Sequence, residues 1–318
     1  MTEARRALVT GGAGFIGSHL VDRLLADEWD VMVVDDLSTG HRENVNAGAE
    51  FEELDVTSSG LDSLFESWRP ARVFHLAAQV NLRRSVEDPA FDTRVNALGT
   101  LRVLEASRRQ AAEQVVFVST GGAIYGEPAY RPCDEKHPCA PLSIYGANKR
   151  VAEHYLEVYR HSYGLRTTAL RFANIYGPRQ DPHGEAGVVA IFSELMLRDR
   201  QPAIFGDGGK TRDYVYVADA VSAVVLAAEG EAKSEGGSRV YNVGRGEEIS
   251  DQEVFDTVAA ACGYAGEPRY EEVRPGEVIR IALDSGLIES ELGWRAGVGF
   301  VEGVELTVPF YRRKLGLD

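Results

Sequence analysis

Short apolar runs alternate with amphipathic stretches through the first half of the chain, and this alternation limits the possible folds more than any other feature. After the first run, Ile16, Leu20 and Leu24 recur at helical spacing, and residues 91–109 read as a long helix. Four runs have the composition of buried strands: ALVT from Ala7, DVMVVDD from Asp30, ARVFHLAA from Ala71 and QVVFVST from Gln114. Uninterrupted apolar strands that alternate with helices predict an α/β protein with a doubly wound parallel sheet.

The size and charge of the chain narrow its class further. Its 318 residues are about twice the common domain size, which favours two domains or one large α/β unit. The 34 Lys and Arg against 49 Asp and Glu give 34 − 49 = −15. So acidic a surface repels phosphate backbones and anionic lipid, and we expect no nucleic-acid or membrane binding.

The cysteines and the termini indicate a reduced, cytoplasmic protein. The three cysteines, Cys133, Cys139 and Cys262, are too few for a disulfide framework in a chain of this length. No CxxC or Cys/His cluster has zinc spacing, so we expect no metal site. The N-terminus reaches a glycine-rich turn before a signal-peptide core could form, and no apolar run approaches the roughly 18 residues that span a bilayer.

A glycine-rich segment, TGGAGFIG at 10–17, lies between the first predicted strand and the first predicted helix. Gly11 permits a tight turn, Gly14 lets the backbone approach a pyrophosphate, and Gly17 lets the helix pack closely on the sheet. The amides at the helix N-terminus add donors and a partial positive charge. The segment therefore predicts a Rossmann-type dinucleotide site.

The next predicted strand ends in Asp35 and Asp36, about 24 residues after Gly11. A carboxylate at this position accepts hydrogen bonds from the adenosine ribose hydroxyls. It also repels a 2′-phosphate, and no Arg follows immediately to compensate. The sequence therefore favours NAD over NADP, although Asp36 by itself is equally well read as an acidic strand end in water.

A second pattern, Tyr145-x-x-x-Lys149, places a phenol and an amine on one face of a predicted helix. The Tyr pKa lies near 10, and a neighbouring ammonium and a positive nicotinamide ring both favour the phenolate. Lowering that pKa to near 7 needs roughly 4 kcal/mol of differential stabilisation. We expect Tyr145 to act as a catalytic base, with Lys149 as its partner.

Several motifs in fixed order resemble the extended short-chain dehydrogenases/reductases, and among them the UDP-glucose 4-epimerase-like enzymes of nucleotide sugars. The resemblance covers essentially the whole chain. Its carriers are TGGAGFIGSHLVDRLL, VVDDLSTG, HLAAQVNLRRSVEDP, VNALGT, STGGAIYGE, YGANK, RFANIYGPRQ, RDYVYVADA and RPGE.

The resemblance implies roles for individual residues. It implies an NAD site formed by Gly11, Gly14, Phe15, Ile16, Gly17, Asp35, Asp36, Ser38, Thr39, Gly40, Asp55, Val56, Leu76, Ala77, Ala78, Gln79, Asn96, Tyr145, Lys149 and Phe172. It implies substrate contacts from Thr120, Asn174, Val189, Ala203, Phe205, Arg212, Arg274 and Glu277. Among these, the two arginines would clamp the diphosphate, Glu277 would bind the uridine ribose, and residues 203–205 would line the uracil.

One position departs from the family pattern. The catalytic Ser or Thr of the family falls on Gly121, which has no hydroxyl. Thr120 is the first candidate to replace it, and Ser119 is the second. The departure concerns this third catalytic group and leaves the Tyr145–Lys149 pair unaffected.

The resemblance implies an NAD-binding domain over 1–180, with returning segments near 212–244, and a nucleotide-sugar domain mainly over 181–318, with the active site in a cleft between them. It implies reversible epimerisation at carbon 4 of a UDP-hexose. A homodimer is expected through the helices at 91–109 and 143–161.

Other activities remain open on the same sequence. The substrate could be a UDP-N-acetylhexosamine, a choice that the medium-sized Ile281 leaves undecided, or UDP-glucuronate, which Asp181 disfavours by repulsion. A 4,6-dehydratase or decarboxylase is a further alternative, but Gly121 and Gly122 occupy the place of a dehydratase's acidic pair. The non-enzyme alternative is an NAD-binding sensor, against which the intact Tyr145 and Lys149 argue.

Overall fold

A computed structural model describes residues 5–183, 187–230, 239–273 and 278–317 of the chain. The chain divides into two compact units, and each is built from separate segments. The first unit consists of Met1–Thr120, Ser143–Arg171 and Val221–Tyr241, and the second of Gly121–Leu142, Phe172–Ala220 and Asn242–Asp318.

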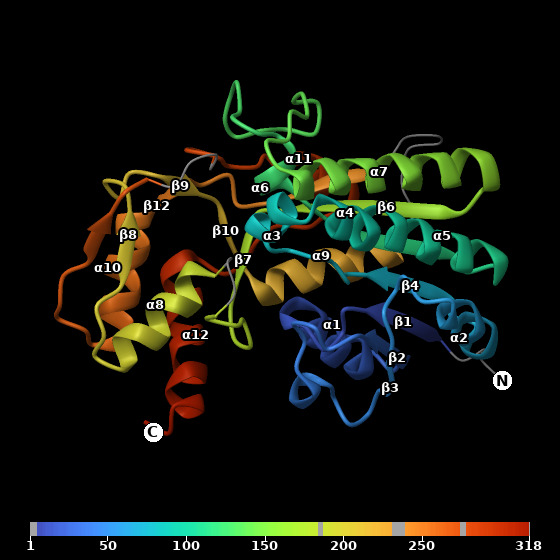
Figure 1. Ribbon diagram of the computed structural model, residues 1–318, viewed down its shortest axis with the longest axis horizontal. Helices are drawn as coiled ribbons and strands as arrows, with labels where there is room; N and C mark the ends of the chain where they lie inside the picture. The colour runs from blue at the N-terminus through green and yellow to red at the C-terminus, as the bar shows by residue number, and fades with distance from the viewer. Residues whose placement is uncertain (1–4, 184–186, 231–238, 274–277, 318) are drawn as a thin grey trace. The chain divides into compact units, whose positions relative to one another are not determined.

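A seven-stranded parallel sheet with flanking helices confirms the predicted α/β, Rossmann-type fold (Figure 1). Its order is β11-β6-β5-β4-β1-β2-β3, so the direction of winding reverses between β1 and β4. In such sheets ligands bind beyond the carboxyl ends of the strands at the point of reversal. The strands are β1 (Arg6–Thr10), β2 (Asp30–Asp35), β3 (Glu50–Glu53), β4 (Arg72–His75), β5 (Gln114–Thr120), β6 (Arg166–Phe172) and β11 (Val240–Val243).

Consecutive apolar residues on the central strands are buried because helices cover the sheet. Ala7, Leu8 and Val9, consecutive on β1, are all 0% exposed, although neighbouring strand residues point to opposite faces. Helix α1 (Phe15–Ala26) packs on β1 and β2. Helices α2 (Gly60–Trp68), α5 (Thr100–Arg109) and α7 (Ile144–Tyr163) share one hydrophobic core with the strands, and Figure 1 shows α5 and α7 side by side.

The predicted helix over 91–109 is helical throughout but not uniform. It consists of α4 (Pro89–Asp92), a π-helical segment (Thr93–Gly99) and α5. A π turn widens the helix and shifts the direction of the side chains that follow it. The wider turn carries Asn96, which is 2% exposed and hydrogen-bonded to Gln79 after β4. Apolar spacing gave no sign of this turn.

The 3₁₀ turn Arg42–Asn44 and α3 (Leu82–Glu87) also belong to the first unit. Helix α9 (Val217–Glu229) begins in the second unit and ends in the first. The run from Arg166 to Tyr176 forms two strands: β6 belongs to the large sheet, whereas β7 (Asn174–Tyr176) pairs with β10 (Tyr214–Tyr216). The two strands have different partners, and these partners separate them at Ala173.

The second unit combines small sheets with a helical core. Helices α8 (Val188–Leu197), α10 (Asp251–Cys262) and α12 (Phe300–Lys314) pack together through Phe192, Val258 and Val304. Strand β8 pairs with β13, and β9 pairs with β12. The remaining bounds are α6 (Gly121–Ile124), β8 (Ala203–Phe205), β9 (Thr211–Arg212), β12 (Ile249–Ser250), β13 (Arg269–Glu271) and α11 (Gly286–Leu292).

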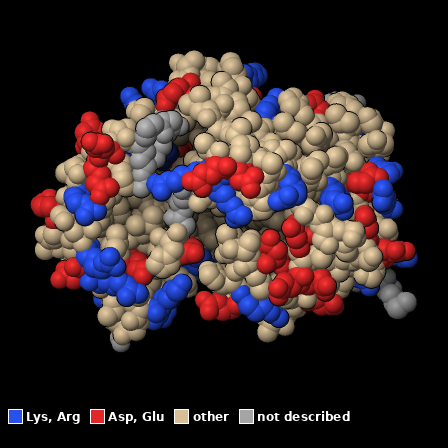
Figure 2. Space-filling view, in the orientation of Figure 1, with Lys and Arg blue, Asp and Glu red and all other residues tan. Residues whose placement is uncertain are grey.

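Three further observations concern the surface, the cysteines and the helices. Figure 2 shows acidic side chains interspersed with basic ones on the face drawn. All three cysteines are free thiols. Over the described ranges, no helix combines the length and the apolar character needed to cross a bilayer.

Candidate active site

The glycine turn after β1 leaves no room for side chains. Gly11 has φ +72°, and a Cβ on it would lie 2.6 Å from the backbone nitrogen of Ala77. A Cβ on Gly17 would lie 2.0 Å from the carbonyl oxygen of Gly11. Helix α1 starts directly after Gly14, with the half-buried Phe15 and Ile16 in its first turn and no acidic side chain there. The turn therefore fits the diphosphate of a dinucleotide.

Asp35, at the end of β2, is held by the backbone around it. Its carboxylate accepts from Ala13 N at 3.0 Å and from Leu37 N at 2.9 Å, and it is 7% exposed. Burial raises its pKa despite these two hydrogen bonds. Each oxygen keeps a second acceptor site, which suits a ribose diol. A Cβ on Gly40 would lie 2.7 Å from the same carboxylate.

The other residues predicted around the adenosine have different surroundings. Asp36 is exposed and accepts from the backbone nitrogen and hydroxyl of Ser38, at 3.0 and 2.6 Å, and Thr39 is exposed beside them. Asp55 is exposed and accepts from Thr57 N at 2.7 Å. Val56 is buried in the core beneath β2 and the helices. These surroundings leave Asp36 and Asp55 accessible and Val56 packed.

In the loop after β4, Leu76, Ala77 and Ala78 are half-buried. A chain of hydrogen bonds with a fixed donor and acceptor at each step lies next to this loop. Ala77 N donates to Thr10 Oγ1 at 3.3 Å, and Thr100 Oγ1 donates to the Asn96 carbonyl at 2.7 Å. His75 lies between them, with Nδ1 2.7 Å from Thr10 Oγ1 and Nε2 3.0 Å from Thr100 Oγ1. The Thr100 proton is already used, so Nε2 must donate and Nδ1 must accept.

His75 is therefore a neutral core histidine in one tautomer. Burial, and then the charge of Lys149, lower its pKa to about 3. Its place at the end of the buried strand β4 fits this core role.

Tyr145 and Lys149 lie four residues apart on α7, whose N-cap Ser143 accepts from Gly146 N at 3.1 Å. Lys149 Nζ donates to the Val118 carbonyl at 3.0 Å and lies 5.9 Å from the Tyr145 ring centroid. Burial lowers the Lys149 pKa to about 8, against the opposing charges of Asp92 and Glu153. An amine with this pKa changes its charge within the working range of a neutral-pH enzyme.

The surroundings of the Tyr145 phenol raise its pKa. Desolvation raises this pKa well above the usual value, the charge of Asp92 raises it further, and a hydrogen bond with Thr120 opposes both. The sequence argument expected the ammonium and a nicotinamide ring to lower the pKa, and it did not count the desolvation of the phenolate. Positive charge brought by a cofactor acts in the lowering direction.

The structure separates the two candidates for the hydroxyl group. Thr120 hydrogen-bonds with Tyr145, whereas Ser119 is 3% exposed and donates to Glu153 Oε1 at 2.7 Å. Gly121 is packed closely, because a Cβ on it would lie 2.4 Å from Leu283 Cδ1. Thr120 is therefore the hydroxyl that lies beside the phenol.

Apart from Thr120, which ends the first segment of the first unit, the described residues predicted to bind the substrate lie in the second unit. The Arg212 guanidinium donates to the carbonyls of Thr211 and Ile279, at 2.8 and 3.3 Å, and has no carboxylate partner among the described residues. The Asn174 side-chain amide also makes no hydrogen bond to any described residue, while its backbone nitrogen donates to the Asp213 carbonyl. Both groups remain available to an anionic or polar ligand.

The other predicted substrate residues vary in exposure. Ala203 and Phe205 are half-buried on β8, and Val189 is 1% exposed in the core of α8. Phe172, predicted for the NAD site, is 4% exposed at the end of β6. Arg274 and Glu277 lie outside the described residues.

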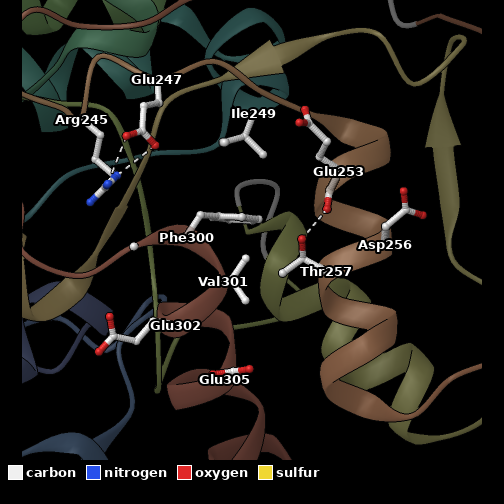
Figure 3. Close-up of a pocket in the computed structure, with 11 residues that line it drawn as sticks. Arg245, Glu247, Ile249, Glu253, Asp256, Thr257, Phe300, Val301, Glu302 and Glu305 are labelled. Atoms are coloured by element: carbon white, nitrogen blue, oxygen red, sulfur yellow. Dashed lines mark hydrogen bonds and ion pairs between the residues drawn. The ribbon is translucent and has the colours of Figure 1, made fainter.

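Two cavities are lined by residues of the second unit. One, of about 630 Å³, is bordered by Phe205 together with Lys210, Tyr270 and Ile279. The other, of about 690 Å³, has an apolar part formed by Ile249, Phe300 and Val301 and a rim of carboxylates (Figure 3). None of the described residues that line this second cavity is a predicted site residue.

Sequence reasoning missed several buried polar residues around Tyr145 and Lys149. Glu153 pairs with Arg171 at 2.7 Å, and Asp92 accepts from Asn148 at 2.7 Å. The only available signal was position, because Asn148 and Glu153 share the helix of the catalytic pair. Asp213, 1% exposed, was also missed, although it directly follows Arg212.

Comparison with known proteins places these features in a wider group. The model of the NAD dependent epimerase/dehydratase family matches residues 7–244. The UDP-glucose 4-epimerase of Mycolicibacterium smegmatis is 47% identical over 314 residues, covering 97% of this chain and 99% of that protein.

Two solved structures have the same fold along nearly their full length. A UDP-glucose 4-epimerase from Thermotoga maritima, with UDP-glucose, is 46% identical with a TM-score of 0.94, over 98% of this chain and 99% of that one. A UDP-glucose 4-epimerase from Thermus thermophilus, in complex with NAD, is 47% identical with a TM-score of 0.90, over 96% of this chain and 99% of that one.

Proposed function

Because the chain belongs to the NAD dependent epimerase/dehydratase family, we propose that it inverts carbon 4 of a UDP-hexose and interconverts UDP-glucose and UDP-galactose. It is an enzyme, and its cofactor is NAD. The first unit carries the glycine turn, Asp35 and the Tyr145–Lys149 pair, and we assign NAD to it. We assign the nucleotide sugar to residues of the second unit, which contains Arg212 and Asn174.

Tyr145 takes the proton of the 4-hydroxyl in the proposed reaction, and Thr120 shares a hydrogen bond with the same phenol. NAD, when bound, would accept the hydride from carbon 4 and return it to the same carbon of the keto sugar, and it would bring a positively charged ring. Lys149 adds an ammonium close to the phenol and so favours the phenolate. After the 4-keto sugar turns about its diphosphate bonds, Tyr145 returns the proton to oxygen on the opposite side of the ring.

Substrate binding must hold the UDP firmly and the sugar loosely, because the sugar has to turn. The Arg212 guanidinium, which has no carboxylate partner within the described ranges, suits the diphosphate, and Arg274 is its proposed second clamp. The Asn174 side-chain amide, which bonds to none of the residues that the structure describes, suits a phosphate oxygen. Glu277 is proposed for the uridine ribose, and Phe205, on the border of a cavity, for the uracil.

The observation that carries this proposal is the half-buried Tyr145 beside the buried Lys149, with Thr120 on the phenol, in the same unit as the glycine turn. Incubation of the purified protein with UDP-galactose should yield UDP-glucose, and Tyr145→Phe should lower kcat by about 10²- to 10⁴-fold. The matched control is Tyr163→Phe at the exposed end of the same helix, which should retain the rate. An undiminished rate in Tyr145→Phe removes this residue from the mechanism.

The same incubation separates the alternative activities. UDP-N-acetylglucosamine and UDP-glucuronate belong in the substrate panel, since the described residues do not fix the sugar. Formation of a 4-keto-6-deoxy sugar would identify a dehydratase instead. The close packing of Gly121 on Leu283 argues against that product, because an acidic side chain at this position would need Leu283 to move.

A homodimer is part of the proposal. Helix α7 exposes Val151 (37%) and Val158 (51%), and the neighbouring π segment exposes Leu98 (49%). Apolar side chains on adjacent helices favour burial against a second copy. Val158→Glu should therefore convert the dimer to a monomer in sedimentation, whereas Val301→Glu, at an equally exposed valine on α12, should not.

A further inference from the structure

A buried carboxylate lies next to the catalytic pair without a cation of its own. Asp92, the last residue of α4, is 0% exposed. Its Oδ1 accepts from Asn148 Nδ2 at 2.7 Å, and its Oδ2 accepts from Gln79 Nε2 at 2.8 Å. Within the described part of the chain, no Lys or Arg nitrogen lies at ion-pair distance from it. Both oxygens act as acceptors, as in an ionised carboxylate.

The two hydrogen bonds join two parts of the proposed site. Asn148 immediately precedes Lys149 and follows Tyr145 by three residues, so it belongs to the helical turn that separates them. Gln79 belongs to the loop after β4, where Asn96 fixes it through two hydrogen bonds of 3.0 and 2.9 Å. Asp92 therefore links the turn of α7 that contains Tyr145 and Lys149 to the loop after β4.

Asp92 differs from the other titratable groups around Lys149 in how its charge is balanced. Glu153 on α7 also faces Lys149, but Arg171 on β6 and Arg150 on α7 pair with it at 2.7 and 2.9 Å. His75 on β4 is neutral. The negative charge of Asp92 is not offset in this way, and it acts on both Tyr145 and Lys149.

We propose that Asp92 is a positioning residue of the reaction. Through Asn148 it fixes the helical turn between Tyr145 and Lys149, and its negative charge favours the protonated form of Lys149. The kinetic part of this inference rests on the proposed epimerase function. The charge part does not, because the protonation of Lys149 can be measured without turnover.

The charge is tested by direct titration of Lys149. The chain has only five lysines, so labelling them with ¹³C at Cε gives a sparse spectrum in which Lys149→Arg identifies the Lys149 signal. In the wild type this signal should titrate near pH 8. In Asp92→Asn its midpoint should fall by roughly one pH unit, since an opposing charge is lost. Asp88→Asn, on the exposed N-cap of the same helix, should leave it unchanged. An equal midpoint in Asp92→Asn and the wild type overturns the charge role.

The positioning is tested with Asn148→Ala, which keeps the carboxylate and therefore does not depend on Asp92→Asn folding. We expect kcat for UDP-galactose to fall about tenfold at every pH with little change in KM, because the phenol and amine lose their orientation. In Asp92→Asn the alkaline limb of the kcat/KM profile should move to lower pH as well. Full kcat in Asn148→Ala overturns the positioning role. A wild type without epimerase activity refutes the proposed function, whereas the Lys149 titration still decides the charge role.

Discussion

At the scale of single residues, the absence of one Cβ decides whether the turn after β1 can form. Gly17→Ala would place a methyl group 2.0 Å from the Gly11 carbonyl oxygen, so the turn or the helix must move. We expect NAD affinity to be lost and the free energy of unfolding to fall by about 1–3 kcal/mol. Calorimetric NAD titration and urea unfolding measure both. Gly299→Ala is the control, because nothing lies within 4 Å of its Cβ and its φ is −67°.

A second prediction at this scale concerns the cost of the buried Lys149. Its pKa of about 8 in the folded protein lies below the unfolded value of 10.5, so between these values the unfolded chain binds more protons. The free energy of unfolding contributed by Lys149 therefore rises with pH across this window, by up to roughly 3 kcal/mol. Lys149→Met should be stabilised relative to the wild type at pH 7, and this advantage should shrink by pH 10. A pH-independent difference in urea unfolding would contradict the assignment.

At the scale of elements, a buried ion pair joins α7 to β6. Glu153 accepts from Arg171 at 2.9 and 2.7 Å, and each residue is 3% exposed. Burial alone raises the Glu153 pKa, but Arg171, with Ser119 and Arg150, outweighs it and holds that pKa below its usual value. Arg171→Met leaves the buried carboxylate with only Arg150 and Ser119 as partners and should cost about 3 kcal/mol of stability. The double variant Glu153→Leu with Arg171→Met should recover much of this loss in urea unfolding. A double variant no more stable than the single one would show that the pair is not the cause.

Local sequence patterns predicted some of the helices and strands but not all of their features. The amphipathic periodicity predicted the long helix at 91–109, and the apolar run predicted β5, because both signals are local. The π turn in that helix and the division of the run after Arg166 into β6 and β7 were not predictable. Each depends on a partner distant in sequence: Gln79 for Asn96 in the π turn, and β10 for β7.

At the scale of the whole molecule, Asp213 organises several segments of the second unit. Its carboxylate accepts from the backbone nitrogens of Arg245, Gly246 and Leu283, at 2.9, 3.0 and 3.1 Å. Burial nevertheless raises its pKa from 3.8 to about 6. The folded protein therefore binds the extra proton, and the stability contributed by protonated Asp213 is present below pH 4 and lost as the pH rises through 6.

Asp213→Asn tests this assignment. The variant lacks the titration, so the wild type should lose free energy of unfolding relative to it between about pH 4 and 7, by roughly 3 kcal/mol. At about pH 4 the wild type should be the more stable protein, because the amide cannot accept all three backbone hydrogen bonds. Thermal unfolding of both proteins across this pH range measures the difference. Parallel curves would locate the titrating group elsewhere.

The sequence by itself determined the alternation of strands and helices, the glycine turn and the spacing of Tyr145 and Lys149, since each is written in neighbouring residues. Only the tertiary structure decided which hydroxyl lies beside the phenol, because Ser119 donates its hydrogen bond to Glu153 and Gly121 packs against Leu283. It also decided the electrostatics of the pair. Burial and the charge of Asp92 depend on segments far apart in the chain, and desolvation cannot be read from the spacing of residues on a helix.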